Sequence, residues 1–152
     1  MEHASDAVRL SLRLIKTSRL IERRIDQMMR ADFGASISRF DFLSALDRNG
    51  PLSLGEVSGH LLVSNGNVTG LAARLRADGL IEASISGSDR RLQIVRLTHA
   101  GQRVFKKMAK AHRTCVEALL ADMSRSERGA LVHLLDRAKA LVQERVKMEA
   151  AP

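Results

Sequence analysis

Apolar residues recur at helical spacing along the N-terminal part of the chain. Between about residues 5 and 31 they fall three, four or six positions apart, with arginine and aspartate between them. A period of 3.6 residues places such positions on one side of a helix. Gly34 interrupts the pattern, and Ser36 or Ser38 is a suitable N-cap for a second helix that stops at Asn49-Gly50-Pro51. The pattern therefore predicts a long amphipathic helix followed by a shorter one.

The next segment contains the signals of two short helices with a brief connection between them. Ser53 and Glu56 have the spacing of a capping box, in which both side chains bind backbone amides of the first helical turn, for a helix that ends near His60. Ser64 is the expected cap of the second helix, which runs to about Ala77. Two short helices in this order predict a helix-turn-helix, whose second helix enters the major groove of DNA.

The period then changes from helical to strand-like. Residues 80–86 and 92–97 are rich in Ile, Val and Leu, and residues 87–91 between them have the composition of a loop. We expect an antiparallel β-hairpin here. A hairpin directly after a recognition helix is a wing, and its basic tip would reach DNA beside the groove.

From Thr98 the helical pattern returns and continues almost to the C-terminus, with a break at residues 124–127. One small chain has too little apolar surface to cover these two stripes and that of the first helix, and a second copy is the natural remedy. We therefore expect a homodimer built from both ends of the chain. The two C-terminal stripes are Phe105, Met108, His112, Cys115, Leu119 and Met123, then Leu131, Leu134, Leu135, Ala138, Leu141, Val142 and Val146.

Together these elements predict a mainly α fold. It is a winged helix-turn-helix with a small antiparallel β-hairpin wing and long N- and C-terminal dimerisation helices. A length of 152 residues suits a single domain. We place the winged helix-turn-helix lobe at about residues 36–98 and the dimerisation helices at about 5–31 and 99–148.

Composition narrows the location and the partners. A hydrophobic fraction of 45% and a charged fraction of 28% are typical of a folded globular chain. No apolar run has the length or flanks of a membrane span or an export signal, so we expect a cytoplasmic protein without a membrane partner. The single cysteine, Cys115, fits a reducing compartment. A net charge of +8 favours a polyanion such as nucleic acid, because neutralising phosphates releases counterions.

Most of the excess charge lies outside the predicted reading unit. From Ser53 to Leu97 five arginines oppose four acids, a net charge of +1, whereas from Thr98 onwards eleven basic residues oppose six acids. Such a basic segment can be solvated, can contact phosphates that flank the operator, or can dock a phosphate-bearing effector. Five basic residues follow one another there at near-helical spacing, opposite the Phe105 stripe: Arg103, Lys106, Lys107, Lys110 and Arg113.

The order and spacing of several segments resemble the MarR (multiple antibiotic resistance regulator) family along nearly the whole chain. The helix-turn-helix likeness is carried by residues 51–57, 62–71, 74–75 and 78–81, and that of the wing by residues 89–91, 95–98 and 101. The resemblance implies a triangular homodimer that reads a pseudo-palindromic operator in double-stranded DNA. It also implies, in many members, a repressor that a small aromatic or phenolic ligand releases. The chain departs from the family at Ala83-Ser84, where members commonly carry further arginines.

The residues expected to touch DNA fall into two groups. The first turns of the recognition helix face base edges, where an asparagine can bond adenine and a threonine methyl can meet thymine; alternatively, the asparagines only support the helix start. A glycine within this helix suggests a close neighbour, of which DNA is one candidate. In the wing, the resemblance implies an arginine in the minor groove, a bracing aspartate and a second arginine near a phosphate. The set is Ser64, Asn65, Asn67, Thr69, Gly70 and Arg74, the last suited to a phosphate, and then Arg91, Asp89 and Arg90.

The resemblance also implies a ligand pocket between the dimer helices and the winged lobe. Methionines would supply adaptable apolar contact and an arginine would pair with a carboxylate, although most of the candidate residues also suit an ordinary core. We expect a small aromatic acid or its coenzyme A thioester as the effector, and no cofactor. The candidate lining residues are Met28, Met29, Phe33, Arg39, Phe40 and His112.

Other functions are weaker expectations. The sequence has no glycine-rich phosphate loop, nucleophile elbow or close carboxylate pair, and its histidines are scattered, so we do not expect an enzyme. We assign no metal site. The alternatives are a redox-responsive regulator that uses Cys115, a metal-responsive regulator that uses His112, Cys115 and His133, and a dimeric interaction module that does not bind DNA.

Overall fold

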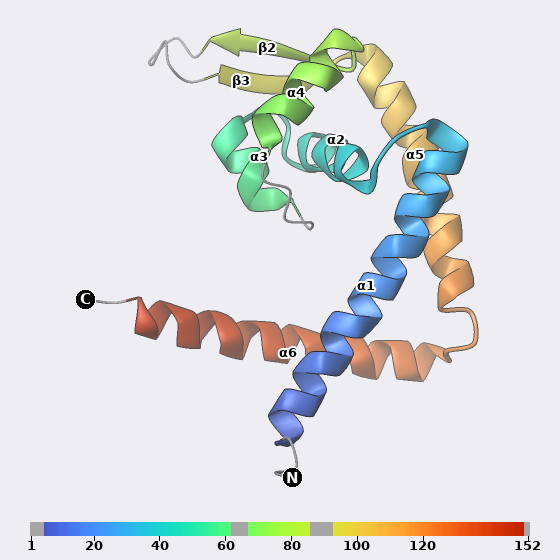
Figure 1. The fold of residues 1–152 in the computed structure, drawn as a ribbon, viewed down its shortest axis with the longest axis vertical. Coiled ribbons are helices and arrows are strands. Elements are labelled where there is room, and N and C mark those ends of the chain that lie inside the picture. The colour runs from blue at the N-terminus through green and yellow to red at the C-terminus, as the bar shows by residue number, and fades with distance from the viewer. Residues whose placement is uncertain (1–4, 62–66, 86–92, 151–152) are drawn as a thin grey trace. The chain divides into compact units, whose positions relative to one another are not determined.

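The computed structural model describes residues 5–61, 67–85 and 93–150. The chain divides into two compact units, residues 1–116 and 117–152. The mainly α fold with a small antiparallel sheet is confirmed (Figure 1). In chain order the elements are α1 (Asp6–Phe33), α2 (Ile37–Asn49), β1 (Leu52–Ser53), α3 (Leu54–His60), α4 (Val68–Ala77), β2 (Ile81–Ile85), β3 (Gln93–Leu97), α5 (His99–Leu119) and α6 (Arg125–Glu149).

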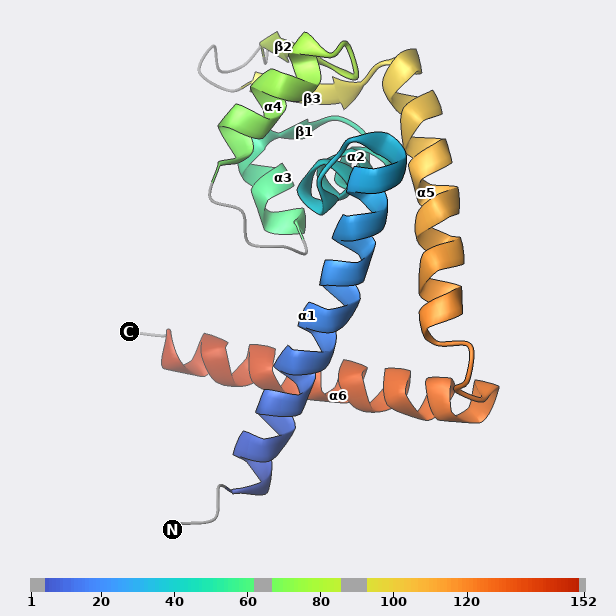
Figure 2. The same cartoon turned by 45° about the vertical axis from the view of Figure 1, so that its right-hand side comes forward.

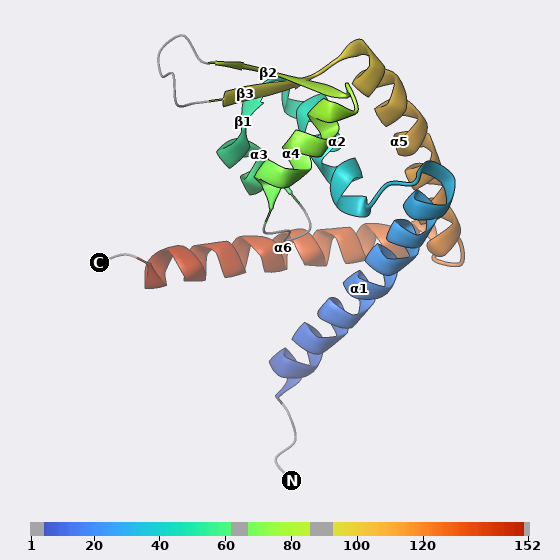
Figure 3. The same ribbon diagram turned by 45° about the horizontal axis from the view of Figure 1, so that its top comes forward.

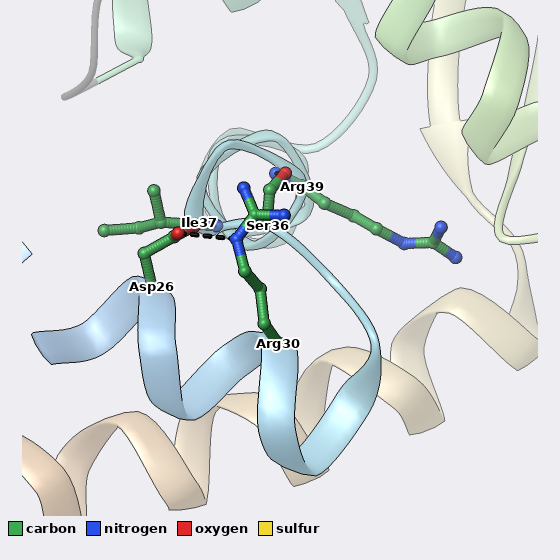
Figure 4. Close-up of polar contacts among 5 residues, drawn as sticks. All are labelled: Asp26, Arg30, Ser36, Ile37 and Arg39. Carbon is green, nitrogen blue, oxygen red and sulfur yellow. Dashed lines mark hydrogen bonds and ion pairs between the residues drawn. The ribbon is translucent and has the colours of Figure 1, made fainter. Parts of the chain in front are cut away.

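The junction between α1 and α2 is defined by backbone and side-chain hydrogen bonds. Gly34 ends α1 in the left-handed region, with φ of 59°, where a glycine carries no steric penalty. The side chain of Asp26 then joins the two helices: Oδ1 accepts from the backbone N–H of Ile37 at 2.9 Å, and Oδ2 accepts from Nε of Arg30 at 2.6 Å (Figure 4). Ser36 caps α2 as predicted, its hydroxyl accepting from the N–H of Arg39. Asp26 of α1 therefore holds the first backbone amide of α2 in place.

The sheet has three strands in the order β1-β3-β2, all antiparallel. Ile81 lies opposite Leu97 and Ile85 opposite Gln93, which confirms the predicted hairpin. Figure 3 shows β2 and β3 as a paired ribbon with the short β1 beside β3. The sequence did not predict β1, because two residues carry no periodicity and their partner, Val95 opposite Leu52, is distant in the chain.

Helix α2 lies at the centre of the first unit, between α5 on one side and α3 and α4 on the other (Figure 2). Phe42 and Leu43 are completely buried, and Phe40 stacks on Phe105 of α5 with ring centroids 5.7 Å apart. The C-terminal turns of α1 add Met29, also completely buried. The apolar core of the lobe is thus assembled around one short helix.

The start of α5 is attached closely to the chain that follows α4. Gly101 lies so near the backbone of Leu80 that a Cβ at this position would overlap the Leu80 carbonyl oxygen. Thr98 completes the attachment: its hydroxyl donates to the carbonyl of Gly79 at 2.7 Å and accepts from the N–H of Gly101 at 3.0 Å. The position of the recognition helix is therefore coupled directly to α5.

The second unit consists mainly of α6, which begins with a capping box formed by Ser124 and Glu127. No residue of α6 is buried. Several large apolar side chains remain exposed along it, among them Leu131, Leu135, Leu141, Val142 and Val146. None of the helices in the described part of the chain is long and apolar enough to cross a membrane.

Asp41 is an unexpected residue within the apolar face of α2. It is only 7% exposed, and its Oδ2 atom has no hydrogen-bond partner among the described residues. Burial, with a smaller contribution from the negative charge of Glu22, raises the pKa of Asp41 to about 6, although the positive charge of Arg48 acts in the opposite direction. The fold therefore favours the protonated carboxyl.

We predict that Asp41→Asn raises the melting temperature at pH 7.5 and that this gain shrinks towards pH 4.5. The folded pKa of Asp41 lies above its unfolded value, so stability falls as the pH rises from about 4 to about 6 and stays low above that range. A difference of about two pKa units corresponds to at most about 3 kcal/mol. Thermal unfolding at several pH values measures the effect.

Asp47→Asn is the matched control, because Asp47 is an exposed carboxylate on the same helix. It reports the general effect of removing one negative charge. A gain from Asp41→Asn that is equal at both pH values, or a loss at pH 7.5, would contradict the prediction.

Candidate nucleic-acid interface

The first helix of the predicted helix-turn-helix begins as the sequence indicated. The hydroxyl of Ser53 accepts from the backbone N–H of Glu56 at 3.2 Å, and the carboxylate of Glu56 accepts from the backbone N–H of Ser53 at 2.8 Å. The hydrogen bonds that the backbone N–H and the hydroxyl of Ser53 donate to this carboxylate hold the pKa of Glu56 below its usual value. Val57 is completely buried and anchors α3 in the core. The capping box thus orients α3 for the helix that follows.

The recognition helix α4 begins at Val68, later than expected. The predicted cap, Ser64, lies outside the described residues, and the N-cap is Asn67, whose side-chain Oδ1 accepts from the N–H of Gly70 at 2.7 Å. Asparagine is as good an N-cap as serine, and this role corresponds to the alternative that the asparagines support the start of the helix. The side-chain oxygen of Asn67 therefore supports the start of the helix.

Gly70 has a close neighbour within the chain itself. A Cβ at this position would lie 2.5 Å from Nδ2 of Asn67, well inside van der Waals contact. The sequence analysis named DNA as one candidate for such a neighbour. The structure identifies the capping side chain as the group that a larger residue would displace.

Helix α4 has a buried face and two accessible flanks. Leu71, Ala72 and Leu75 pack into the core. On one flank Arg74 borders a hollow of about 430 Å³ next to the α1–α2 junction. On the other flank Thr69 borders a narrow hollow of about 120 Å³ next to the sheet. Exposed polar residues of α4 therefore lie between the junction and the wing.

The described strands of the wing carry an exposed ion pair. Nε of Arg96 on β3 lies 2.7 Å from Oε1 of Glu82, its direct partner on β2. Pairs of opposite charge at facing positions stabilise an antiparallel sheet modestly. The charge of Arg96 is therefore paired within the sheet. The next two residues of β2, Ala83 and Ser84, carry no charge.

Some predicted DNA-contacting residues lie outside the described part of the chain. They are Ser64 and Asn65 before α4, and Asp89, Arg90 and Arg91 between β2 and β3. Their roles stay predictions from the sequence. Of the remaining members, Asn67, Thr69 and Arg74 are exposed, and Gly70 is half-buried.

The candidate effector residues separate into two places. Phe40 and His112 are stacked, with ring centroids 4.7 Å apart, and the neighbouring Met28 and Met29 are buried core residues. Burial, with a further contribution from Arg48, lowers the pKa of His112 and favours its neutral ring. Phe33 is half-buried against the same core.

Arg39 lies apart from this aromatic cluster. Its Nη1 atom is 2.7 Å from Oδ2 of Asp78, the C-cap residue of α4, so the pair joins α2 to the end of the recognition helix. Its side chain borders the hollow that contains Arg74. Neighbouring residues of a helix point in different directions, which is why the side chains of Arg39 and Phe40 lie on different sides of α2.

The sequence analysis missed three residues with clear structural roles. Asp26 and Arg30 have the four-residue spacing of a helical ion pair, a signal that was available but that did not indicate the bond to Ile37. Asp41 had no distinguishing signal, because an aspartate in a short helix is normally exposed.

The structure also places the residues of the metal-responsive and redox-responsive alternatives and of the basic segment on α5. Among residues 5–61, 67–85 and 93–150, no three His, Cys, Asp or Glu side chains form a cluster that could hold a metal ion. Cys115 is half-buried beside the core. The basic residues Arg103, Lys106, Lys107, Lys110 and Arg113 are all exposed on α5.

Comparisons with known proteins agree with this architecture. Residues 33–92 match a model of the MarR family. The HTH-type transcriptional repressor NicR of Pseudomonas putida is 31% identical over 111 residues, which cover 73% of this chain and 70% of NicR. The transcriptional activatory protein BadR of Rhodopseudomonas palustris is 29% identical over 134 residues, which cover 85% of this chain and 75% of BadR.

A solved structure is similar over most of its length. It is that of BpsR from Bordetella bronchiseptica, whose DNA binding is regulated by 6-hydroxynicotinic acid. The two chains are 25% identical and superpose with a TM-score of 0.71 over 84% of this chain and 98% of BpsR. The structure contains a helix-turn-helix with a paired-strand wing. A family model matches this lobe, and similar proteins match beyond it, so this chain belongs to the MarR family of transcriptional regulators.

Proposed function

We propose that this protein is a homodimeric regulator that binds a pseudo-palindromic operator in double-stranded DNA and acts in the cytoplasm. The observation that carries the proposal is the geometry of α4, which buries Leu71 and Leu75 while exposing Asn67, Thr69 and Arg74 beside a two-stranded ribbon. A helix presented in this way fits the major groove, and a wing next to it fits the adjacent minor groove.

Repression is the proposed action, because a dimer that occupies an operator excludes other proteins from it. NicR is named a repressor, and BadR is named an activatory protein, so both actions occur among the relatives. The position of the operator relative to the promoter determines which action results.

We predict that Arg91→Ala weakens operator binding at least tenfold and leaves the melting temperature almost unchanged. An arginine in a narrow minor groove gains from the concentrated negative potential, and losing a contact of this kind costs about 1–3 kcal/mol. A gel-shift titration on a fragment of the protein's own promoter, at several salt concentrations, measures the loss.

Arg24→Ala is the control for this experiment, because Arg24 is an exposed arginine on α1. Equal affinity of the Arg91→Ala chain and the unmodified chain would refute the assignment of Arg91. If the unmodified chain shifts no duplex at any salt concentration, the dimeric interaction module becomes the better description.

The homodimer is proposed from the apolar side chains that a protomer leaves exposed. On α1 these include Val8 and Ile15, which are 49% and 44% exposed, and on α6 they include Val142, which is 62% exposed. Burial of such surface stabilises by about 25 cal/mol per Å² of apolar area. A second copy with the same stripes is the partner with the matching chemistry.

We predict that the combined change Leu135→Glu and Val142→Glu converts a dimer into a monomer. Both residues lie on the apolar face of α6, and two carboxylates there would have to be desolvated in the interface. Analytical ultracentrifugation measures the mass. The combined change His133→Glu and Ala140→Glu has the same spacing on another face of α6 and should stay dimeric; equal behaviour of the two variants would contradict the proposed interface.

The proposed effector is a small aromatic acid or its coenzyme A thioester. The rings of Phe40, Phe105 and His112 are stacked at the boundary of α2 and α5, and His112 is the half-buried member of this cluster. BpsR supports this choice, because an aromatic acid regulates its DNA binding. Met28, Met29 and Phe33 would contribute the apolar wall.

We predict that an aromatic acid or its thioester releases the protein from DNA and that His112→Ala reduces this response at least tenfold. The test titrates the protein–DNA complex with 6-hydroxynicotinic acid, benzoate and benzoyl-coenzyme A. Release by a free acid alone would exclude the thioester. His99→Ala, an exposed histidine on the same helix, is the control and should respond like the unmodified chain.

A further inference from the structure

The hollow beside α4 combines positive side chains from three different helices. Arg30 comes from the end of α1, Arg39 from the first turn of α2 and Arg74 from α4. The volume of the hollow is about 430 Å³. Arg30 and Arg39 both precede residues 53–97, the predicted reading unit, which has a net charge of only +1. Arg30 and Arg39 therefore add positive charge next to a reading unit whose own net charge is small.

The acids near the hollow leave it with an excess of positive charge. Asp26 pairs with Arg30 and also accepts the N–H of Ile37, and Asp78 pairs with Arg39. Three guanidinium groups thus face two carboxylates. Each guanidinium has five N–H donors, and one carboxylate engages two of them at most. Donors remain for a further anion, and the side chain of Arg30 is 64% exposed.

The position of the hollow relative to α4 indicates which anion it would meet. The major groove of B-DNA is about 12 Å wide, so a helix lying in it has a row of phosphates along each flank. The sheet lies against the flank of α4 that contains Thr69. The hollow lies against the flank that contains Asn67, Leu71 and Arg74. One flank therefore faces the wing, and the other faces the arginines of the α1–α2 junction.

The side chains of Arg30 and Arg39 extend in different directions. Figure 4 shows Arg30 turned towards Asp26 and the start of α2, while the side chain of Arg39 extends away from that pair. Arg39 is held in this direction by Asp78 at the end of α4. Cations separated in this way suit successive phosphates of one strand better than a single compact anion.

We propose that the α1–α2 junction is a second phosphate-binding surface, in which Arg30 and Arg39, together with Arg74, hold the DNA backbone on the side of the major groove opposite the wing. This inference rests on the proposed DNA-binding function. It gives Arg39 a phosphate as its ligand in place of the effector carboxylate expected from the sequence.

The test measures how DNA affinity depends on salt for the full-length protein. Each neutralised phosphate contributes about 0.9 to the slope of log K against log salt concentration, and two arginines in two protomers should contribute about 3.6. The combined change Arg30→Gln and Arg39→Gln is expected to lower the slope by this amount. It should weaken binding to an operator and to an unrelated duplex by the same factor, because phosphate contacts do not read sequence.

Two further variants separate charge from structure. Arg30→Lys with Arg39→Lys keeps both charges and should keep the slope even if the ion pairs to Asp26 and Asp78 change. Arg24→Gln removes an exposed arginine of α1 that does not line the hollow and should leave the slope as it is. Thermal unfolding of every variant shows that the compared chains are folded.

The outcomes distinguish this inference from the proposed function. A slope in the glutamine variant equal to that of Arg24→Gln, with DNA binding retained, overturns only the second phosphate surface. Unchanged DNA binding together with a lost response to aromatic acids also overturns it and returns Arg39 to the effector. An unmodified chain that binds no duplex overturns both proposals.

Discussion

Burial of α2 on nearly every side is the constraint on which the rest of the structure depends. Phe40, Asp41 and Phe42 are consecutive residues of one short helix, so their side chains point in different directions, and each is buried. Helices α1 and α3, the strand β3 and Phe105 of α5 pack against it, and α4 packs in turn against α3 and β2. The recognition helix has a defined orientation as a result of this central packing.

The elements with strong local signals could be predicted from the sequence. The capping box at Ser53 and Glu56 marks the start of α3, and the long stripes predict α1, α5 and α6. Local signals are sufficient there because capping and periodicity act over only a few residues. The start of α4 was predicted less accurately: the expected cap, Ser64, lies outside the described residues, and Asn67 is the N-cap.

What could not be predicted depends on contacts between distant residues. The strand β1 exists only because Leu52 meets Val95, and the bond from Ile37 to Asp26 spans eleven positions. The ion pair of Arg39 was not predicted for the same reason: its partner, Asp78, is the C-cap residue of another helix. Asp41 shows the limit most clearly, because its burial follows from helices on all sides of α2 and not from its own neighbours in sequence.

The carboxylate of Asp26 has a mechanical consequence. Because one side chain holds both Arg30 within α1 and the first amide of α2, a rotation of α1 about its own axis pulls on the beginning of α2. Gly34 provides the bend between the two helices, and the side-chain bond restricts how far that bend can open. The orientation of α1 and the entry of the chain into α2 are therefore linked through a single carboxylate, and both of its hydrogen bonds oppose a change in the angle between the two helices.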